Sequence, residues 1–179
     1  GKTTTIGMIL GLLKPSKGKV LINGFEIESK RVDLLNNLNF ISPYIELPKK
    51  LTVKENLEVY GRLYDVKNLS SKIEYLSDKL RLNEIIYKIT GELSSGQKNR
   101  VSLAKSIIND PTVLLLDEPT ASLDPETGDF VRSFLENYQK EKEASILLAS
   151  HNMAEVERLC SSVLMMKNGV IIDQESPKT

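Results

Sequence analysis

Cysteine and long apolar runs are the features that this sequence has least of. One cysteine, Cys160, stands among 179 residues, so no disulfide can form within the chain, and this composition suits a reducing compartment. No apolar run approaches the ~20 residues that a membrane-spanning helix needs. We therefore expect any association with a membrane to come through a partner protein.

Net charge is missing as well, because 24 acidic residues balance 24 basic residues. Proteins that bind nucleic acids generally carry an excess of Lys and Arg, so we expect no nucleic-acid partner. Hydrophobic residues make up 40% of the sequence, which is enough to build a real core. The length then predicts a single domain over residues 1–179 with a smaller lobe.

The most informative stretch ends in two adjacent acids. Val113–Leu116 is an uninterrupted apolar run, typical of a strand buried on both faces of a parallel sheet, and Asp117 and Glu118 follow it. Ligands of such sheets bind at the carboxyl ends of the strands. Two adjacent carboxylates repel each other unless a cation lies between them and a ligand, so the pair indicates Mg²⁺ and a nucleotide. A purely structural Asp-Glu turn is the alternative.

The first residues, Gly1–Thr4, are the last part of a phosphate-binding loop of pattern G-x-x-x-x-G-K-[ST]. We therefore expect the chain to begin within that motif. A helix is predicted over Thr3–Leu13, and the positive end of its dipole would face the phosphates. Lys2 is predicted to reach the terminal phosphates and the Thr3 hydroxyl to bind Mg²⁺. Gly-Lys-Thr is common by chance, and its weight here comes from its pairing with Asp117.

A second candidate for phosphate binding is the segment Ser94–Gln97, which opens a predicted helix that ends near Asn109. A serine hydroxyl and a glycine at a helix N-terminus can bind an anion. Two phosphate sites on one domain make sense if each is half of a composite site, so the pattern predicts a symmetric head-to-tail dimer. There, Ser94 and Gly96 would contact the γ-phosphate held by the partner's Lys2. An ordinary helix N-cap is the alternative.

Local signals predict the remaining helices and hairpins. Asn-Gly pairs indicate β-hairpins over residues 19–27 and 163–172. Two capping-box patterns open helices within a lobe that covers about residues 52–92, and these patterns are Thr52 with Glu55 and Ser71 with Glu74. The apolar stripes of these helices are expected to be core, and they comprise Val53, Leu57, Tyr60, Tyr64, Ile73, Leu76 and Leu80.

His151 is the only histidine of the chain, and it follows another apolar run at residues 144–149. This run is predicted to be a second buried strand, which would deliver the histidine to the ligand-binding edge of the sheet. A lone histidine is more often a core or surface residue, which is the alternative. A short amphipathic helix is predicted over Met153–Leu159, with Val156 and Leu159 facing inward.

Together these segments resemble the nucleotide-binding domain of an ABC transporter, over essentially the whole chain. The matching segments are the end of the Walker A loop (Gly1–Thr4), the family signature (Leu93–Gln97), the Walker B strand with its catalytic acid (Leu114–Glu118), the D-loop (Ser122–Asp124) and the switch histidine (Ser150-His151). The resemblance implies an α/β fold of the P-loop NTPase type, with a mostly parallel central sheet, a helical signature subdomain and a partial antiparallel β region.

The resemblance also implies hydrolysis of MgATP between two such domains, with ATP and Mg²⁺ as cofactors. Glu118 and His151 would be catalytic, and Thr3 and Asp117 would hold the metal ion. The nucleotide-binding residues would be Gly1, Lys2, Thr3, Thr4, Ser94, Ser95, Gly96, Gln97 and Asp124. By the same resemblance, Asp124 would bridge across the dimer near the partner's phosphate loop.

Two protein partners follow from the resemblance, a second ATPase domain, identical or related, and an integral membrane permease subunit. The chain would then lie at the cytoplasmic face of the cell membrane, attached through the permease, with Tyr44–Lys50 in the contact region. The stretch Leu51–Tyr64 and the compact helical lobe after it look like those of ABC-2 or multidrug exporters. Export of a solute is therefore expected.

Two positions depart from the family pattern. Pro43 stands where the family carries a glutamine that links the metal ion and the attacking water to the permease, and proline has no amide side chain. Ser95 replaces the first of two glycines, where it would either loosen the fit or add a hydrogen-bond donor. Two alternatives therefore stay open, an ABC ATPase that moves no solute and a nucleotide-dependent regulatory module with weak hydrolysis.

Overall fold

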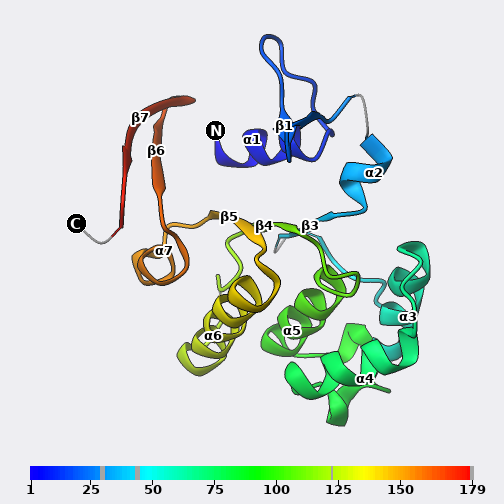
Figure 1. Cartoon of the computed structure of the whole chain (residues 1–179). Coiled ribbons are helices and arrows are strands. Elements are labelled where there is room, and N and C mark those ends of the chain that lie inside the picture. Colours follow the sequence, from blue (N-terminus) through cyan, green and yellow to red (C-terminus); the bar gives the residue numbers. More distant parts are fainter. Residues whose placement is uncertain (29–30, 43–44, 122, 178–179) are drawn as a thin grey trace.

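A three-stranded parallel sheet lies at the centre of the computed structural model, which describes residues 1–28, 31–42, 45–121 and 123–177 (Figure 1). The strands β3 (Leu38–Ile41), β4 (Val113–Asp117) and β5 (Ser145–Ala149) lie in that order, and both neighbouring pairs are parallel. Asp117 at the end of β4 is in register with Ala149 at the end of β5. Residues that follow these two strands therefore leave the sheet at the same edge.

The two faces of the sheet are covered by different helices (Figure 1). The helix α1 (Lys2–Ile9) lies over one face, and α5 (Ser95–Ser106) and α6 (Pro125–Lys142) lie over the other. Successive residues of a strand point to opposite faces. Accordingly Leu115 belongs to the small core under α1, whereas Leu114 and Leu116 belong to the large core on the side of α5 and α6. Asp117 has the same parity as Leu115, which places it on the α1 side.

The large core also holds the helices α3 (Val53–Leu63) and α4 (Leu69–Lys79), with two short 3₁₀ helices, η1 (Asn83–Ile85) and η2 (Thr90–Glu92), after them. The capping box of α3 is confirmed, because the Thr52 side chain and the Glu55 side chain each bond the other's backbone N–H. The expected stripe residues Val53, Leu57, Ile73, Leu76 and Leu80 are buried, and Tyr60 and Tyr64 pack partly buried against them.

The predicted start of α4 is wrong. This helix begins at Leu69 after Asn68, which has left-handed dihedral angles, and no side chain caps it. Ser71 therefore lies inside the first turn, where its hydroxyl cannot serve as the N-cap. The chain turns sharply here because Asp65 and Asn68 both adopt positive φ, and the N-cap therefore lies three residues earlier than predicted, at Asn68 instead of Ser71.

Two predicted helix ends are also too late. The helix α1 ends at Ile9 instead of Leu13, because Gly11 adopts a φ of +66° and ends the helix in a Schellman motif. In that motif the Leu12 N–H donates to the Gly7 carbonyl at 2.9 Å. The helix α5 ends at Ser106, and Asn109 is bonded instead to the sheet, where its side chain accepts from Asn39 Nδ2 at 2.6 Å.

Both predicted hairpins are confirmed. The strands β1 (Leu21–Ile22) and β2 (Phe25–Glu26) pair around Asn23-Gly24, and β6 (Val163–Lys167) and β7 (Val170–Glu175) pair around Asn168-Gly169. All four turn residues have positive φ, as a type I′ turn requires. The short helix α2 (Arg31–Leu35) precedes β3, and α7 (Met153–Leu159) precedes β6.

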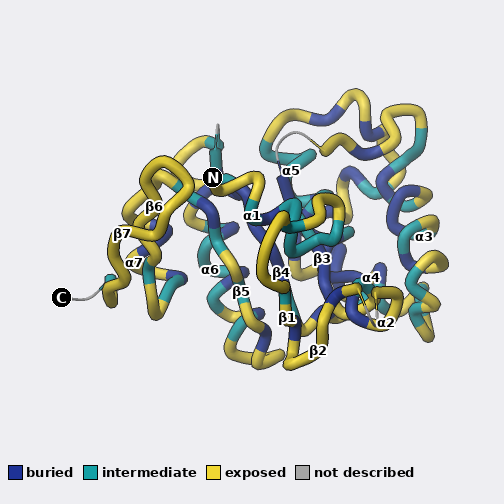
Figure 2. The backbone as a smooth tube through the Cα atoms, turned by 90° about the horizontal axis from the view of Figure 1, so that it is seen from above, coloured by how far each residue is buried: buried dark blue, intermediate teal, exposed yellow. Residues whose placement is uncertain are grey.

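The strand β5 is less buried than predicted. Figure 2 colours part of this strand as exposed. Ser145 is exposed and Leu147 is 38% exposed, although Ala149 is buried in the small core. This exposure arises because β5 is an edge strand of the described sheet. The small core under α1 includes the end of β5, at Ala149. Within the described ranges, no helix combines the length and apolarity needed to cross a bilayer.

Candidate functional site

Three residues from distant parts of the chain meet at the carboxyl edge of the sheet. The Lys2 ammonium at the start of α1 lies 3.4 Å from Glu118 Oε1, and His151 Nδ1 lies 2.7 Å from the same oxygen. Glu118 directly follows β4, and His151 comes two residues after β5. The sequence pattern predicted this meeting from the parallel strands, and the structure brings the three side chains together.

Glu118 reaches this position through an unusual backbone conformation. Strand alternation would point it away from α1, yet its φ is +50°, in the left-handed region that glutamate rarely adopts. The backbone N–H of Glu118 donates to the Ala149 carbonyl at 2.8 Å, which extends the β4–β5 pairing by one bond and holds the turn in place. Strained residues of this kind gather at functional sites.

The two adjacent acids are in different electrostatic states. Burial raises the pKa of Asp117, and the charge of Glu118 raises it further, while Lys2 acts in the opposite direction. Burial also acts to raise the pKa of Glu118, but the hydrogen bond and charge of His151, with those of Lys2, bring it below its ordinary value. Glu118 is therefore the readily ionised acid, and the charged form of Asp117 is the costly one.

The residues around Asp117 offer few metal ligands, which suits Mg²⁺ better than a metal ion that protein side chains alone surround. Asp117 is 5% exposed, and a cation would offset the cost of its charge. Thr3, the other predicted ligand, lies exposed in the first turn of α1. In the part of the chain that the structure describes, no three His, Cys, Asp or Glu side chains form a metal cluster. Mg²⁺ typically takes one or two protein oxygens and completes its shell with phosphate and water.

The start of α5 is a complete capping box. The Ser94 hydroxyl accepts the Gln97 N–H at 3.3 Å, and the Gln97 side chain accepts the Ser94 N–H at 3.0 Å. The N-cap interpretation of Ser94 is therefore correct as far as the folded monomer is concerned. Ser95 and Gly96 occupy the first two helical positions. A Cβ built on Gly96 would lie 3.4 Å from Thr127 Cγ2, which is ordinary contact, so the monomer itself has room for a side chain there.

The two candidate phosphate sites are separated by the sheet. Lys2 begins α1 on one face, and Ser94 begins α5 on the other (Figure 1). No hydrogen bond or ion pair between described residues joins Lys2 to the segment Ser94–Gln97. Asp124 also belongs to the α5–α6 side, where it caps α6 by accepting the Thr127 N–H at 2.9 Å. Its pKa is lowered mainly by that backbone hydrogen bond.

Gln97, Asp124 and Thr127 line one side of a groove of about 730 Å³ beside the starts of α5 and α6. A smaller cavity of about 310 Å³ lies next to Glu118 and is also lined by Ser95.

Three predicted positions, Pro43, Tyr44 and Ser122, lie outside the described residues.

One buried acid near the site escaped the sequence prediction. Glu155 in α7 is 1% exposed and accepts hydrogen bonds from the hydroxyls of Thr120 and Ser150. The helix pattern was interpreted only through Val156 and Leu159. Glu155 lies four residues before Leu159 and therefore on the same inward stripe, which was the signal that could have revealed it.

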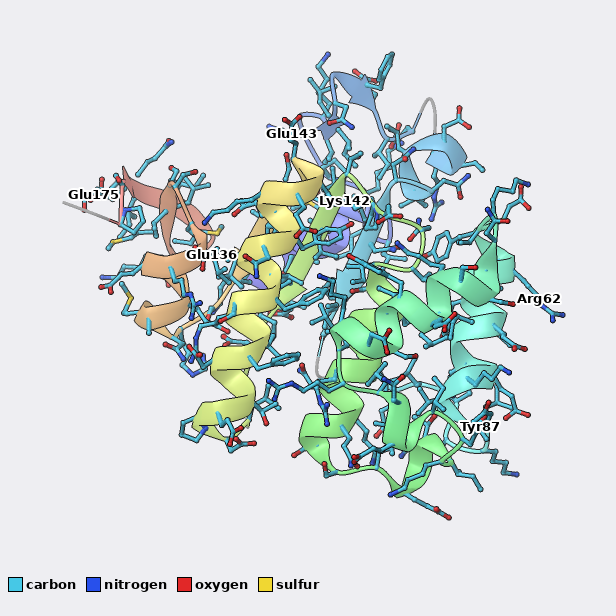
Figure 3. All side chains as sticks on the ribbon, turned by 60° about the horizontal axis from the view of Figure 1, so that its bottom comes forward. Arg62, Tyr87, Glu136, Lys142, Glu143 and Glu175 are labelled. Atoms are coloured by element: carbon cyan, nitrogen blue, oxygen red, sulfur yellow. The ribbon has the colours of Figure 1, made fainter. Side chains whose placement is uncertain are left out.

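The position of α7 itself is fixed by Arg158. Its guanidinium bonds Asp129 at 2.8 Å, Ser133 at 2.8 Å and Glu136 at 3.0 Å, all on α6. Figure 3 labels Glu136 on this helix. A guanidinium that bonds three groups of one helix surface holds two helices in one orientation. The helix α7, which follows the His151 segment, is thus anchored to α6 independently of any ligand.

Comparison with known proteins gives consistent matches. Residues 1–121 match the model of the family described as ABC transporter. NatA of Bacillus subtilis, an ABC transporter ATP-binding protein, is 34% identical over 175 residues, which cover 96% of this chain and 71% of NatA. The Nod factor export ATP-binding protein I of Rhizobium johnstonii is 36% identical over 180 residues, which cover 99% of this chain and 57% of that protein. The chain thus spans less than two thirds of the latter relative.

A solved structure shares the fold. The protein cbiO1 from Clostridium perfringens, described as part of the ABC transporter complex cbiONQ, superposes with a TM-score of 0.84 at 30% identity. The superposition covers 99% of this chain and 73% of cbiO1. It confirms the predicted α/β architecture with parallel and antiparallel strands.

Proposed function

Because this chain belongs to the ABC transporter family, as its matched residues and its identity to NatA show, we propose that Lys2, Asp117 and Glu118 form an MgATP-hydrolysing site of a transporter. The meeting of Lys2 and His151 on one oxygen of Glu118 carries this proposal. It joins a phosphate-binding cation, a general base and a second proton-bearing group at one edge of the sheet. These groups can neutralise phosphate charge and orient the attacking water, which are the main contributions of a protein to phosphoryl transfer.

Each residue has a physical role in the proposed reaction. The ammonium of Lys2 and the N-terminal N–H groups of α1 bind the phosphates. Thr3 and Asp117 would hold Mg²⁺, and the ion would supply positive charge to offset that of the phosphate oxygens. Glu118, whose pKa is lowered, is ionised at neutral pH and accepts the proton of the attacking water. His151 bonds Glu118 through Nδ1, which leaves Nε2 to contact the γ-phosphate.

We propose a head-to-tail dimer as the hydrolysing unit. The support is that Lys2 and the segment Ser94–Gly96 lie at the starts of helices on opposite faces of the sheet (Figure 1), and that no hydrogen bond or ion pair between described residues joins the two. A second ATPase domain in the opposite orientation would supply the missing half to each site. Asp124 lies on the same side as Ser94 and would approach the partner together with it.

We propose further that the dimer drives an integral membrane permease, as the ATP-binding subunit at the cytoplasmic face of the membrane. The cbiO1 description as part of a transporter complex supports a membrane partner, and the Nod factor relative supports export, the direction expected for the ABC-2 type. Residues 1–179 act as a single ATPase domain, with the helical lobe at about residues 52–92 placed to face the permease.

The test is ATP hydrolysis by the full-length protein, alone and co-purified with its membrane partner in lipid nanodiscs, with Glu118→Gln as the inactive control. Stimulation of hydrolysis by the membrane partner supports the transport function. ATP binding without hydrolysis in either sample would contradict it and would favour a regulatory module, the alternative that Ser95 leaves open.

A further inference from the structure

Glu155 is, with Asp117, one of two buried acidic residues in the part of the chain that the structure describes, and both oxygens of its carboxyl group accept hydrogen bonds. The Thr120 hydroxyl donates to Oε1, and the Ser150 hydroxyl donates to Oε2 at 2.6 Å. At 1% exposure, water cannot replace these bonds. An acid in such a place is costly unless its hydrogen bonds are complete, so both hydroxyls must stay where they are.

The two hydroxyls belong to the two segments that carry the proposed catalytic side chains. Thr120 lies two residues after Glu118, and Ser150 directly precedes His151. Glu118 and His151 are themselves joined at 2.7 Å. The structure therefore contains a closed ring, which runs from Glu118 along the backbone to Thr120, through the Glu155 carboxyl to Ser150, and through His151 back to Glu118.

Glu155 is not needed for other tasks of its helix. The N-cap of α7 is Asn152, whose side chain accepts the Ala154 N–H at 3.0 Å. The attachment of α7 to α6 is made by Arg158. The Ser150 oxygen accepts the Asn152 N–H at 3.0 Å, which directs the one hydroxyl proton of Ser150 to Glu155. The hydroxyl of Ser150 is therefore held at both its acceptor and its donor position, by the Asn152 N–H and by the Glu155 carboxyl.

We infer that Glu155 is a positioning residue, whose carboxyl ties the segment after β4 to the segment after β5 and so holds His151 against Glu118. The inference rests on the proposed ATP hydrolysis. Loss of one bond in the ring would remove a link that holds the two segments together. A misplacement of 1 Å caused by a residue outside the reacting atoms can lower a rate by as much as about a hundredfold.

The first test is steady-state ATPase kinetics of the full-length protein with Glu155→Gln, Thr120→Val or Ser150→Ala. The glutamine amide offers one acceptor where the carboxyl offers two, and the other variants each remove one hydroxyl. We expect kcat to fall by about ten- to a hundredfold while KM for ATP stays within about twofold, because Lys2 and the N–H groups at the start of α1 are untouched. Glu157→Gln, on the exposed side of the same helix, is the control and should leave both constants unchanged.

A second readout does not depend on activity. The ¹⁵N chemical shifts of the His151 ring report the hydrogen bond of Nδ1, and the signals are assigned by their loss in His151→Ala. Glu155→Gln should move these shifts toward those of an imidazole without a carboxylate partner, and Glu157→Gln should not. If Glu155→Gln does not fold, Thr120→Val and Ser150→Ala provide the same comparison. Unmoved shifts in all three variants would overturn the inference, even if the protein proved not to hydrolyse ATP.

A double-mutant cycle decides between positioning and general destabilisation. If Glu155 acts through His151, Glu155→Gln should lower kcat by less than about twofold once His151 is already alanine. A full, multiplicative loss in that background would show that Glu155 acts elsewhere. Absence of ATP hydrolysis by the wild-type protein would instead contradict the proposed function, and the ring shifts of His151 would still decide the role of Glu155.

Discussion

Lys2 Nζ lies 3.4 Å from Glu118 Oε1, although 116 residues separate the two in the sequence. The two side chains are 49% and 19% exposed, and a partly exposed ion pair contributes only about 0–1 kcal/mol to stability. Stability therefore does not explain the pair. The pair is important because it brings a positive charge at the start of α1 next to a negative charge at the end of β4. The free N–H groups of α1 lie at the same place.

Removal of the Lys2 charge should weaken nucleotide binding more than folding. Lys2→Ala loses charge-assisted hydrogen bonds to phosphate, each worth about 1.5–3 kcal/mol, so the ATP affinity should fall by roughly 10- to 150-fold. Isothermal titration calorimetry with MgATP on the full-length protein measures this change. Lys14→Ala is the matched control, because Lys14 forms an exposed ion pair with Glu28; an equal loss of affinity in both variants would remove Lys2 from the site.

Gly96→Ala tests whether Gly96 is needed for the stability of the monomer or for the close approach of the partner's nucleotide in the dimer. The added methyl group meets Thr127 only at ordinary contact distance, and alanine is the better helix former, so the free energy of unfolding should stay constant or rise by up to about 1 kcal/mol. Overpacking against the partner's nucleotide would cost about 1–3 kcal/mol, which corresponds to a loss of ATPase activity of roughly 5- to 150-fold.

The control for this variant is Gly128→Ala in α6, where the new Cβ meets only the flexible end of Arg132. This change should leave hydrolysis intact. Normal ATPase activity of Gly96→Ala would show that no ligand or partner approaches the start of α5, and the composite site would then be wrong.

Asp117 and Glu118 should respond in opposite directions when their charges are removed in the absence of nucleotide and metal. The pKa of Asp117 is raised by burial and by Glu118, so this acid contributes stability below its ordinary pKa of 3.8 that is lost as pH rises. Asp117→Asn should therefore raise the melting temperature at pH 7, and the gain should shrink as pH falls toward 3.8.

Glu118 is the matched comparison. Burial acts to raise its pKa, but His151 and Lys2 lower it below the ordinary value of 4.5, so its charge stabilises the fold above that pH. Glu118→Gln should lower the melting temperature at pH 7. Thermal unfolding in a metal chelator measures both variants, and a shift of the same sign in the two would contradict the electrostatic assignment.

The parts of the fold that sequence could predict are those set by local rules. Asn23-Gly24 and Asn168-Gly169 specify their hairpins, and Thr52 with Glu55 specifies the start of α3, because each signal acts within a few residues. The meeting of Lys2, Glu118 and His151 was also predictable, since the ends of parallel strands share one edge of the sheet.

The features that sequence could not predict depend on packing. The early end of α1 follows from the positive φ of Gly11, which competed with the Pro15 stop signal several residues later. The exposure of Leu147 follows from the limited reach of α1 over β5, which an apolar run does not reveal. The role of Glu155 needs two hydroxyls that are 30 residues apart in the sequence, Thr120 and Ser150, and only the folded chain brings them together.

The most direct test of the site is Glu118→Gln in the full-length protein, with ATP affinity and ATP hydrolysis measured on the same preparation. The amide keeps the shape of the side chain but cannot accept the proton of water. We expect ATP binding to stay nearly intact and turnover to fall by roughly 10²–10⁴, the usual contribution of a general base. Turnover within a few-fold of the wild-type rate would contradict the assignment of Glu118 as the residue that activates the attacking water.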